Sequence, residues 1–238
     1  VRRWQSSLLN SRLGKQRLPR LANIPRLVQL LSCSDGRCRW AVECLCCISA
    51  VEDPTVAEAI CSAGAVPRLV QLLSSGNVIM QECAACTLGN IARDKAGAEA
   101  CAAAGGIDAL LQCLCTSSNE WVQAAAAGTV RNLADVLEAA FPQPGCVPSL
   151  VRLLRSSSDE EVLQPVAAAL ANLFRYIPCC AAAGAAAGCI PRLVQLMGSS
   201  SNQSVRQLAV EATSACLWAA QTPQQQSRRQ AAALRCSG

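Results

Sequence analysis

The sequence repeats a ten-residue phrase five times, and the spacing of the copies constrains the fold more than any single residue does. The phrase is clearest at residues 64–73, as GAVPRLVQLL, and it returns at residues 188–197 as GCIPRLVQLM. Looser copies begin at Ala22, Gly105 and Gly145. Successive copies are separated by 42, 41, 40 and 43 residues, measured between Ile24, Val66, Ile107, Val147 and Ile190. A period near 40 with helical filling predicts a stack of small helical units rather than one globular core.

Each period reads as a short, a medium and a long helix. Residues 55–61 and 95–101 predict short helices that end in Ala-Gly, where glycine supplies the left-handed conformation that stops a helix. The phrase itself predicts the medium helix, with a broad apolar face and Pro67 at a favoured first-turn position. A polar turn follows, and a long helix is expected from about Val78 to Arg93. Ser, Asn and Asp residues in these turns are placed to cap the long helices.

Composition excludes several classes of function. The chain is 52% hydrophobic but only 3% aromatic, which favours closely packed helices over strands. Because it contains no histidine, Ser-His or Cys-His catalysis and imidazole metal sites are excluded. We therefore expect no enzyme, no catalytic residue, no metal and no cofactor. The net charge of +5 is partly concentrated in the first 26 residues, so a general nucleic-acid surface is not indicated.

The 17 cysteines fall inside helical patterns, and several are adjacent or nearly so. We interpret them as reduced, small apolar residues of an intracellular, cytoplasmic protein, with the nucleus also open. Cys83-x-x-Cys86 has a zinc-like or redox-like spacing, but it lies in a predicted helix without a second matching pair, so we expect packing. No signal peptide is visible, and residues 176–191 are too short and too interrupted to predict a membrane span.

These features resemble armadillo repeats over about residues 22–236. The family phrase Leu-x-Asn-[Leu/Ile]-Ala near the end of the long helix is matched at residues 88–92, 130–134 and 170–174. The resemblance implies an all-α, right-handed α-α superhelix of about five three-helix units. We divide the chain into a basic segment or degenerate cap, five repeats, and the loop and first helix of a sixth: 1–21, 22–63, 64–104, 105–144, 145–187, 188–220 and 221–238.

In armadillo folds the long third helices line a concave groove, and recurring asparagines hold the backbone of an extended peptide. The resemblance assigns that role here to Asn90, Asn132 and Asn172. A carboxamide can pair with both the N–H and the C=O of a peptide, and each bond contributes roughly 0.5–1.5 kcal/mol, so several are needed. The alternative is that these asparagines form hydrogen bonds between the units only, and both interpretations stay open.

Other residues on the same helix stripe set the expected partner. Arginines stand beside the asparagines, and on this stripe tryptophans occur only in the outer units; they are Arg93, Arg131, Arg175, Trp40 and Trp218. Importin-α places Trp four residues before each Asn to grip Lys side chains, but Cys86, Gly128 and Ala168 stand there in this chain. We therefore expect a non-catalytic scaffold that binds a neutral or mildly acidic extended protein segment, with no small-molecule substrate, nucleic acid or membrane insertion.

Three alternatives remain open: an importin-α-like transport adaptor, the targeting array of a larger protein of the ubiquitin-ligase type, and a purely structural scaffold such as those of cilia or vacuole attachment. One irregularity is also expected. The short helix at residues 137–141 precedes Pro142 and Pro144, which should shorten or abolish it. The basic N-terminal segment is either an arm or, as we favour, a degenerate unit.

Overall fold

The computed structural model describes residues 21–33, 35–51, 53–137 and 146–218, and the chain divides into two compact bodies, Val1–Phe141 and Pro142–Gly238. We call these the N-terminal and C-terminal bodies and treat each by itself. Every regular element among the described residues is a helix. The prediction of an all-α fold is therefore confirmed for this part of the chain.

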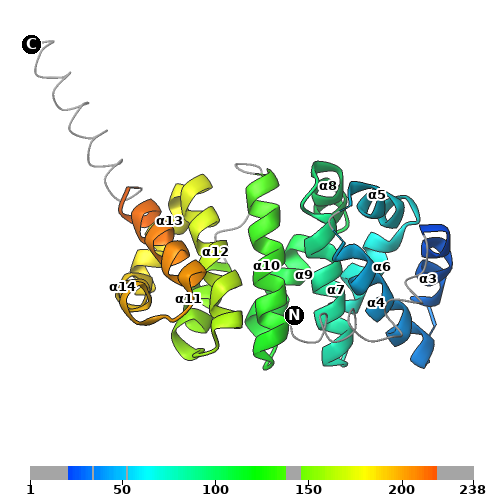
Figure 1. Cartoon of the computed structure of the whole chain (residues 1–238), viewed down its shortest axis with the longest axis horizontal. Helices are drawn as coiled ribbons and strands as arrows, with labels where there is room; N and C mark the ends of the chain where they lie inside the picture. The colour runs from blue at the N-terminus through cyan, green and yellow to red at the C-terminus, as the bar shows by residue number, and fades with distance from the viewer. Residues whose placement is uncertain (1–20, 34, 52, 138–145, 219–238) are drawn as a thin grey trace, which may run out of the picture. The chain divides into compact units, whose positions relative to one another are not determined.

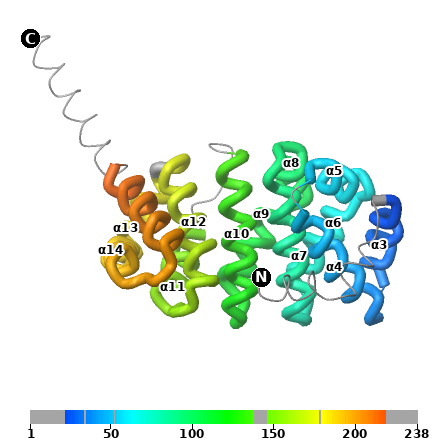
Figure 2. Tube along the Cα trace, in the orientation of Figure 1, coloured from blue at the N-terminus to red at the C-terminus, as the bar shows by residue number. Residues whose placement is uncertain are grey.

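In its described residues, the N-terminal body contains a first unit of one short 3-10 helix and two α-helices, followed by two complete three-helix units (Figure 1). Their elements are η1 (Leu21–Asn23), α3 (Ile24–Leu30) and α4 (Gly36–Ser49); α5 (Pro54–Ser62), α6 (Ala65–Leu72) and α7 (Val78–Ile91); and α8 (Lys95–Ala103), α9 (Gly106–Thr116) and α10 (Glu120–Leu137). The colour passes from blue to green one unit at a time, so units that are consecutive in sequence are neighbours in space (Figure 2).

The C-terminal body repeats the same order. Its elements are α11 (Val147–Ser156), α12 (Glu160–Tyr176), α13 (Pro178–Ala186), α14 (Cys189–Ser199) and a last helical segment at residues 203–218. The predicted irregular helix at 137–141 lies, apart from Leu137, outside the described residues. Leu137 itself ends α10 instead of starting a short helix.

The local signals predicted from sequence act as expected. Gly64, Gly105 and Gly188 have φ of 75°, 74° and 75°, which is the left-handed conformation that turns the chain from a short helix into a medium one. Side chains in the polar turns accept hydrogen bonds from backbone amides at the start of every long helix; they are Asp35, Asn77, Asn119, Asp159 and Asn202. The predicted capping of the long helices is thereby confirmed.

Small residues let the long helices approach closely. Gly89 of α7 and Thr129 of α10 are both buried, and a Cβ on Gly89 would lie only 2.7 Å from Thr129 Oγ1. The Thr129 hydroxyl donates to the backbone oxygen of Ala85 in α7, 2.7 Å away, and also lies 2.9 Å from the oxygen of Ala125 in its own helix. This contact fixes the register of two neighbouring third helices.

Side chains of other helices donate hydrogen bonds to the free backbone oxygens at the carboxyl ends of the medium helices. The backbone oxygen of Leu73 accepts from Gln81 Nε2 at 3.1 Å and from Cys113 Sγ at 3.3 Å. Arg192 Nε donates to the oxygen of Leu154 at 3.1 Å, and its Nη2 donates to that of Ser157 at 3.0 Å. Each of these carbonyls would otherwise lack a helical partner. Gln81 belongs to the same unit as Leu73, whereas Cys113 and Arg192 donate from the following unit and so join one unit to the next.

Within the described residues no single helix is long and apolar enough to cross a membrane. Two bent helix pairs, α8 with α9 and α13 with α14, satisfy the same length and composition test jointly.

Candidate peptide-binding face

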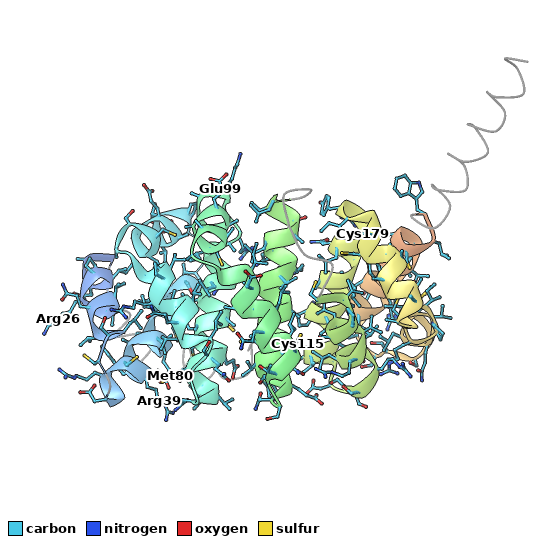
Figure 3. The ribbon with its side chains drawn as sticks, turned by 180° about the vertical axis from the view of Figure 1, so that it is seen from behind. Arg26, Arg39, Met80, Glu99, Cys115 and Cys179 are labelled. Atoms are coloured by element: carbon cyan, nitrogen blue, oxygen red, sulfur yellow. The ribbon has the colours of Figure 1, made fainter. Side chains whose placement is uncertain are left out.

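The predicted site residues lie on the long helices, which pack side by side within each body (Figure 1). In the N-terminal body α7 packs between α4 and α10. The amino-terminal parts of α4 and α7, marked by Arg39 and Met80, lie at one edge of this body, and Glu99 of α8 lies at the opposite edge (Figure 3). We call the partly exposed surface of α4, α7 and α10 the third-helix face.

Asn90 is half-buried at the end of α7 and is held by the preceding unit. Its Nδ2 donates to Ser49 Oγ in α4 at 3.0 Å, and Ser49 Oγ donates in turn to the backbone oxygen of Cys46. The carboxamide oxygen of Asn90 accepts no hydrogen bond from the described residues. One N–H therefore anchors this side chain, while its second N–H and its oxygen have no protein partner there.

Asn132 occupies the equivalent position on α10, but its carboxamide is more fully used. Its Nδ2 donates to the backbone oxygen of Gly89 at 2.7 Å. Its Oδ1 accepts from Arg131 Nε at 3.0 Å and from Arg131 Nη2 at 2.6 Å. The interpretation that these asparagines join neighbouring units is thus supported by direct contacts for both Asn90 and Asn132.

Asn172 lies half-buried on α12, in the C-terminal body. The three predicted asparagines therefore belong to two bodies: Asn90 and Asn132 lie on the third-helix face of the N-terminal body, and Asn172 lies in the C-terminal body. These three residues were grouped because they occupy the same position of the repeat in the sequence. Their role in binding a peptide stays a prediction.

The predicted tryptophans are exposed. Trp40 on α4 has 54% of its surface exposed, and Trp218 at the end of the last helix has 61%. Near Trp40, Arg39 Nε donates to Glu43 Oε1 at 2.8 Å, so this part of the third-helix face carries an ion pair rather than a net charge. An exposed indole beside a neutralised pair provides apolar contact area with a hydrogen-bond donor at its rim.

The arginines are exposed, and Arg175 has an acidic partner in the next unit. Arg175 Nη2 lies 3.3 Å from Glu211 Oε2, and Glu211 also accepts from Gln207. Arg93 follows the carboxyl end of α7 and is exposed. Because Arg175 is paired with Glu211, it contributes less positive potential to its surface than its position in the sequence suggested.

The positions that hold tryptophan in importin-α are small and largely buried here. Cys86 is 8% and Ala168 is 4% exposed, and Gly128 is half-buried. Cys83 and Cys86 are packed against Cys46 of α4, and hydrogen bonding with the Cys46 thiol together with burial raises the pKa of both above the ordinary value. These thiols are packing groups, as expected for Cys83-x-x-Cys86.

Comparison with known proteins identifies the fold family. A family model described as "Armadillo/beta-catenin-like repeat" matches residues 53–93, 94–135 and 139–175, which together make up half of the chain. The chain belongs to the armadillo repeat family. The matches at residues 53–93 and 94–135 begin just before the short helices α5 and α8, so the family model starts each repeat at its short helix. Our predicted repeats start at the medium helix instead, and their boundaries stay a prediction.

Solved structures show the same architecture. An engineered protein is 29% identical over 91% of this chain and 96% of its own, with a TM-score of 0.74. A computationally designed armadillo repeat protein for modular peptide recognition is 25% identical over 82% of both chains, with a TM-score of 0.68. A designed armadillo repeat protein in complex with the peptide (KR)4 has a TM-score of 0.68 at 23% identity, over 90% of this chain and 98% of its own. No curated protein matches the sequence.

Armadillo proteins are generally non-catalytic scaffolds, and no group of three His, Cys, Asp or Glu side chains in the described ranges is placed to hold a metal ion. The C-terminal body has an open depression of about 420 Å³ on α11, lined by Pro148, Val151, Arg152, Arg155, Ser156 and Ala187. None of these lining residues is among the predicted site residues. The depression and the candidate face are therefore different surfaces.

Apart from the asparagines, sequence reasoning missed the polar residues that join consecutive armadillo repeats. Glu160 of α12 accepts hydrogen bonds from the hydroxyls of Ser201 and Ser200, each at 2.8 Å, and from the backbone amides of Ser201 and Asn202. The hydrogen bonds from Ser201 and Ser200 lower the pKa of Glu160. Glu160 and Ser201 are 41 residues apart, as are Asn90 and Ser49. Polar pairs separated by one repeat period were the signal that could have revealed these contacts.

Proposed function

We propose that this protein is a non-catalytic scaffold that binds an extended segment of a partner protein along the third-helix face of its N-terminal body. The observation that carries the proposal is the state of Asn90. One amide proton fixes its carboxamide to Ser49, and the other proton and the oxygen are left for a ligand. A fixed carboxamide with one donor and one acceptor to offer matches a peptide group irrespective of its side chain.

The surroundings of Asn90 favour a particular kind of segment. The Arg39–Glu43 pair is neutral overall, whereas the hydrogen bond from Arg131 to the uncharged carboxamide of Asn132 leaves the positive charge of the guanidinium in place. Small, buried residues replace the tryptophans that would hold Lys side chains, so the importin-α-like alternative is disfavoured. We infer a neutral or mildly acidic segment whose apolar side chains pack near Trp40. Free thiols throughout the described residues support an intracellular setting for this activity.

A comparison of Asn90→Ala with Ser49→Ala tests the proposal. Both substitutions remove the same internal hydrogen bond, but only Asn90→Ala removes the carboxamide. Peptides would first be selected from a phage-displayed random library on the wild-type chain, and their affinities for both variants would then be measured by calorimetry. A synthetic alternating Lys-Arg peptide, of the kind held by one designed relative, would be measured alongside.

We expect Asn90→Ala to weaken the selected peptides by about tenfold or more, because two hydrogen bonds of about 0.5–1.5 kcal/mol each are lost. Ser49→Ala should weaken them only several-fold, and the Lys-Arg peptide should bind less tightly than the selected ones. Equal losses in the two variants would show that Asn90 acts only between repeats. Preferential binding of the Lys-Arg peptide would return the importin-α-like alternative.

A further inference from the structure

The open depression of the C-terminal body follows one side of the medium helix α11. Its lining residues within α11 recur at the spacing of a single helix face; they are Pro148, Val151, Arg152, Arg155 and Ser156. Ala187, which directly precedes the turn into α14, completes the lining. Since α11 packs on α12, α13 and α14, the depression is built within one body (Figure 1).

The depression has an apolar floor and a basic rim. Val151 is only 2% exposed and forms the floor, whereas Arg152 and Arg155 are exposed. None of the described residues that line the depression is acidic. The acidic residues that follow along the chain serve other contacts, because Asp159 caps α12 and Glu160 accepts hydrogen bonds from the turn at 200–202.

Only this copy of the repeated phrase carries the two arginines. The position of Arg152 holds glutamine in the other four copies, as Gln29, Gln71, Gln112 and Gln195. The position of Arg155 holds a small uncharged residue in those copies, as Ser32, Ser74, Cys115 and Gly198. Because the other medium helices form without these charges, the fold itself does not require the two arginines.

The arginines also change which polar groups this helix face offers. In α6 and α14 an arginine donates to the glutamine three residues later, with Arg68 Nη1 to Gln71 Oε1 and Arg192 Nη1 to Gln195 Oε1 both at 2.9 Å. In α11 that arginine is replaced by Ser149 and the glutamine by Arg152. A guanidinium has only donors, so α11 carries donors and positive charge where α6 and α14 carry an acceptor that is already used.

Arg192 of the next repeat makes the end of α11 more favourable for an anion. The carboxyl end of a helix carries partial negative charge on its unpaired backbone oxygens. Arg192 Nε donates to the oxygen of Leu154 at 3.1 Å, and its Nη2 donates to that of Ser157 at 3.0 Å. These bonds offset the negative end of the helix beside Arg155 and place a third guanidinium next to it.

We propose that the depression on α11 binds an acidic segment of a partner protein. Two Asp or Glu carboxylates of this segment pair with Arg152 and Arg155, and an apolar side chain between them packs on Pro148 and Ala187. Arginine pairs with carboxylates through two parallel hydrogen bonds, which gives the contact direction as well as strength. An apolar floor with two arginines suits a protein segment better than a nucleic acid, whose binding depends on many phosphate contacts.

This site lies apart from the third-helix face and does not depend on the function proposed for that face. The other repeats supply a variant that removes its charges with little risk to the fold. Arg152→Gln combined with Arg155→Ser, which we call the α11 variant, gives α11 the residues that α6 has at the same positions. Arg26→Gln combined with Arg68→Gln is the control variant, because it removes the same charge from exposed residues of two other medium helices.

A phage-displayed random-peptide library would be selected on the wild-type chain in the presence of excess soluble α11 variant. This competition removes peptides whose binding is independent of the two arginines. Calorimetry would then measure the affinities of the selected peptides, and of copies with glutamine or asparagine in place of each acidic residue, for the wild type and both variants. Circular dichroism would establish that each variant is folded and give its Tm.

The selected peptides should be acidic and should bind the α11 variant at least about tenfold more weakly than the wild type, because charge-assisted hydrogen bonds are lost. The control variant and Asn90→Ala should bind them as the wild type does. The uncharged copies should bind the wild type as weakly as the acidic peptides bind the α11 variant.

Three results would overturn the proposal. Equal weakening in the control variant would show that only the net charge of the protein matters. Failure to select acidic peptides that distinguish the α11 variant, with or without a fall in its Tm, would show that the arginines serve only the end of α11. A single-stranded oligodeoxynucleotide that prefers the wild type to the α11 variant, when no peptide does, would assign the surface to nucleic acid instead.

Discussion

The contact between Gly89 and Thr129 predicts a double-mutant coupling whose sign and size follow from the structure. In Gly89→Ala the new methyl would lie 2.7 Å from Thr129 Oγ1, and Thr129 is held by hydrogen bonds to Ala85 and Ala125. Forcing an extra methyl group into the packed contact between α7 and α10 costs about 1–3 kcal/mol of stability, and loss of the hydrogen bond from the displaced Thr129 hydroxyl costs about 0.5–1.5 kcal/mol more. Replacing glycine by alanine in a helix returns about 1 kcal/mol.

The expected net loss for Gly89→Ala is therefore about 2 kcal/mol, which corresponds to a fall in Tm of about 4–8 °C for a chain of this size. Thr129→Ala alone should cost about 1 kcal/mol. In the double variant the clashing oxygen is gone, and the remaining neighbours of the new methyl are the Thr129 Cα and Cβ positions at 3.4 and 3.5 Å, which is ordinary contact. The double variant should then cost at least about 1 kcal/mol less than the sum of the single variants.

Urea denaturation followed by far-UV circular dichroism measures the free energy of unfolding of the wild type, the two single variants and the double variant. Gly198→Ala is the control, because Gly198 also lies inside a helix but has nothing within 4 Å of the place where alanine would add its methyl group. This control should be neutral or stabilising by up to about 1 kcal/mol. If the losses of stability in Gly89→Ala and Thr129→Ala added to that of the double variant within about 0.5 kcal/mol, the close approach of α7 and α10 would be refuted.

Three further outcomes are expected. Gly97→Ala should destabilise the chain by about 3 kcal/mol in thermal denaturation, because its Cβ would lie 2.0 Å from the backbone oxygen of Ile91, and a loss below about 1 kcal/mol would contradict that geometry. Because the pKa of Glu160 is lowered, its carboxylate stabilises the fold at pH values above its ordinary pKa of 4.5, and this stabilisation is lost as the pH falls through the pKa of the folded state. Glu160→Gln should therefore make Tm depend less on pH on the acid side, and an unchanged Tm–pH curve would contradict this role of Glu160. Maleimide at neutral pH should label the exposed Cys179 at least about a hundredfold faster than Cys83, which is buried and has a raised pKa, as peptide mapping would show.

The repeat period made the helices predictable. Short helices expected at 55–61 and 95–101 are α5 and α8, and the long helix expected from Val78 to Arg93 is α7, which ends two residues earlier at Ile91. Local signals decide these elements: glycine in the left-handed conformation, capping side chains in the turns, and apolar residues at helical spacing. Where the period weakens, between residues 137 and 146, the sequence did not predict the division into two bodies at Phe141.

The use of the asparagines could not be predicted, because it depends on which partner each amide finds one repeat away. Asn90 and Asn132 occupy equivalent positions, yet Asn90 donates to a serine hydroxyl and Asn132 to a backbone oxygen. Arg131 then occupies the oxygen of Asn132, and no similar neighbour occupies that of Asn90 among the described residues. The repeat period assigned one role to both residues, but the packing between helices gives them different hydrogen-bond partners.

If Asn90 binds a peptide as proposed, Ser49 influences the affinity without touching the peptide itself. A free asparagine side chain rotates, and ordering a side chain at an interface costs about 0.5–1.5 kcal/mol. Because Ser49 already accepts a proton from Asn90, that rotational entropy is lost when the protein folds rather than when a ligand arrives. In calorimetry the weaker binding of Ser49→Ala should therefore appear in the entropy of association, while its enthalpy stays close to that of the wild type.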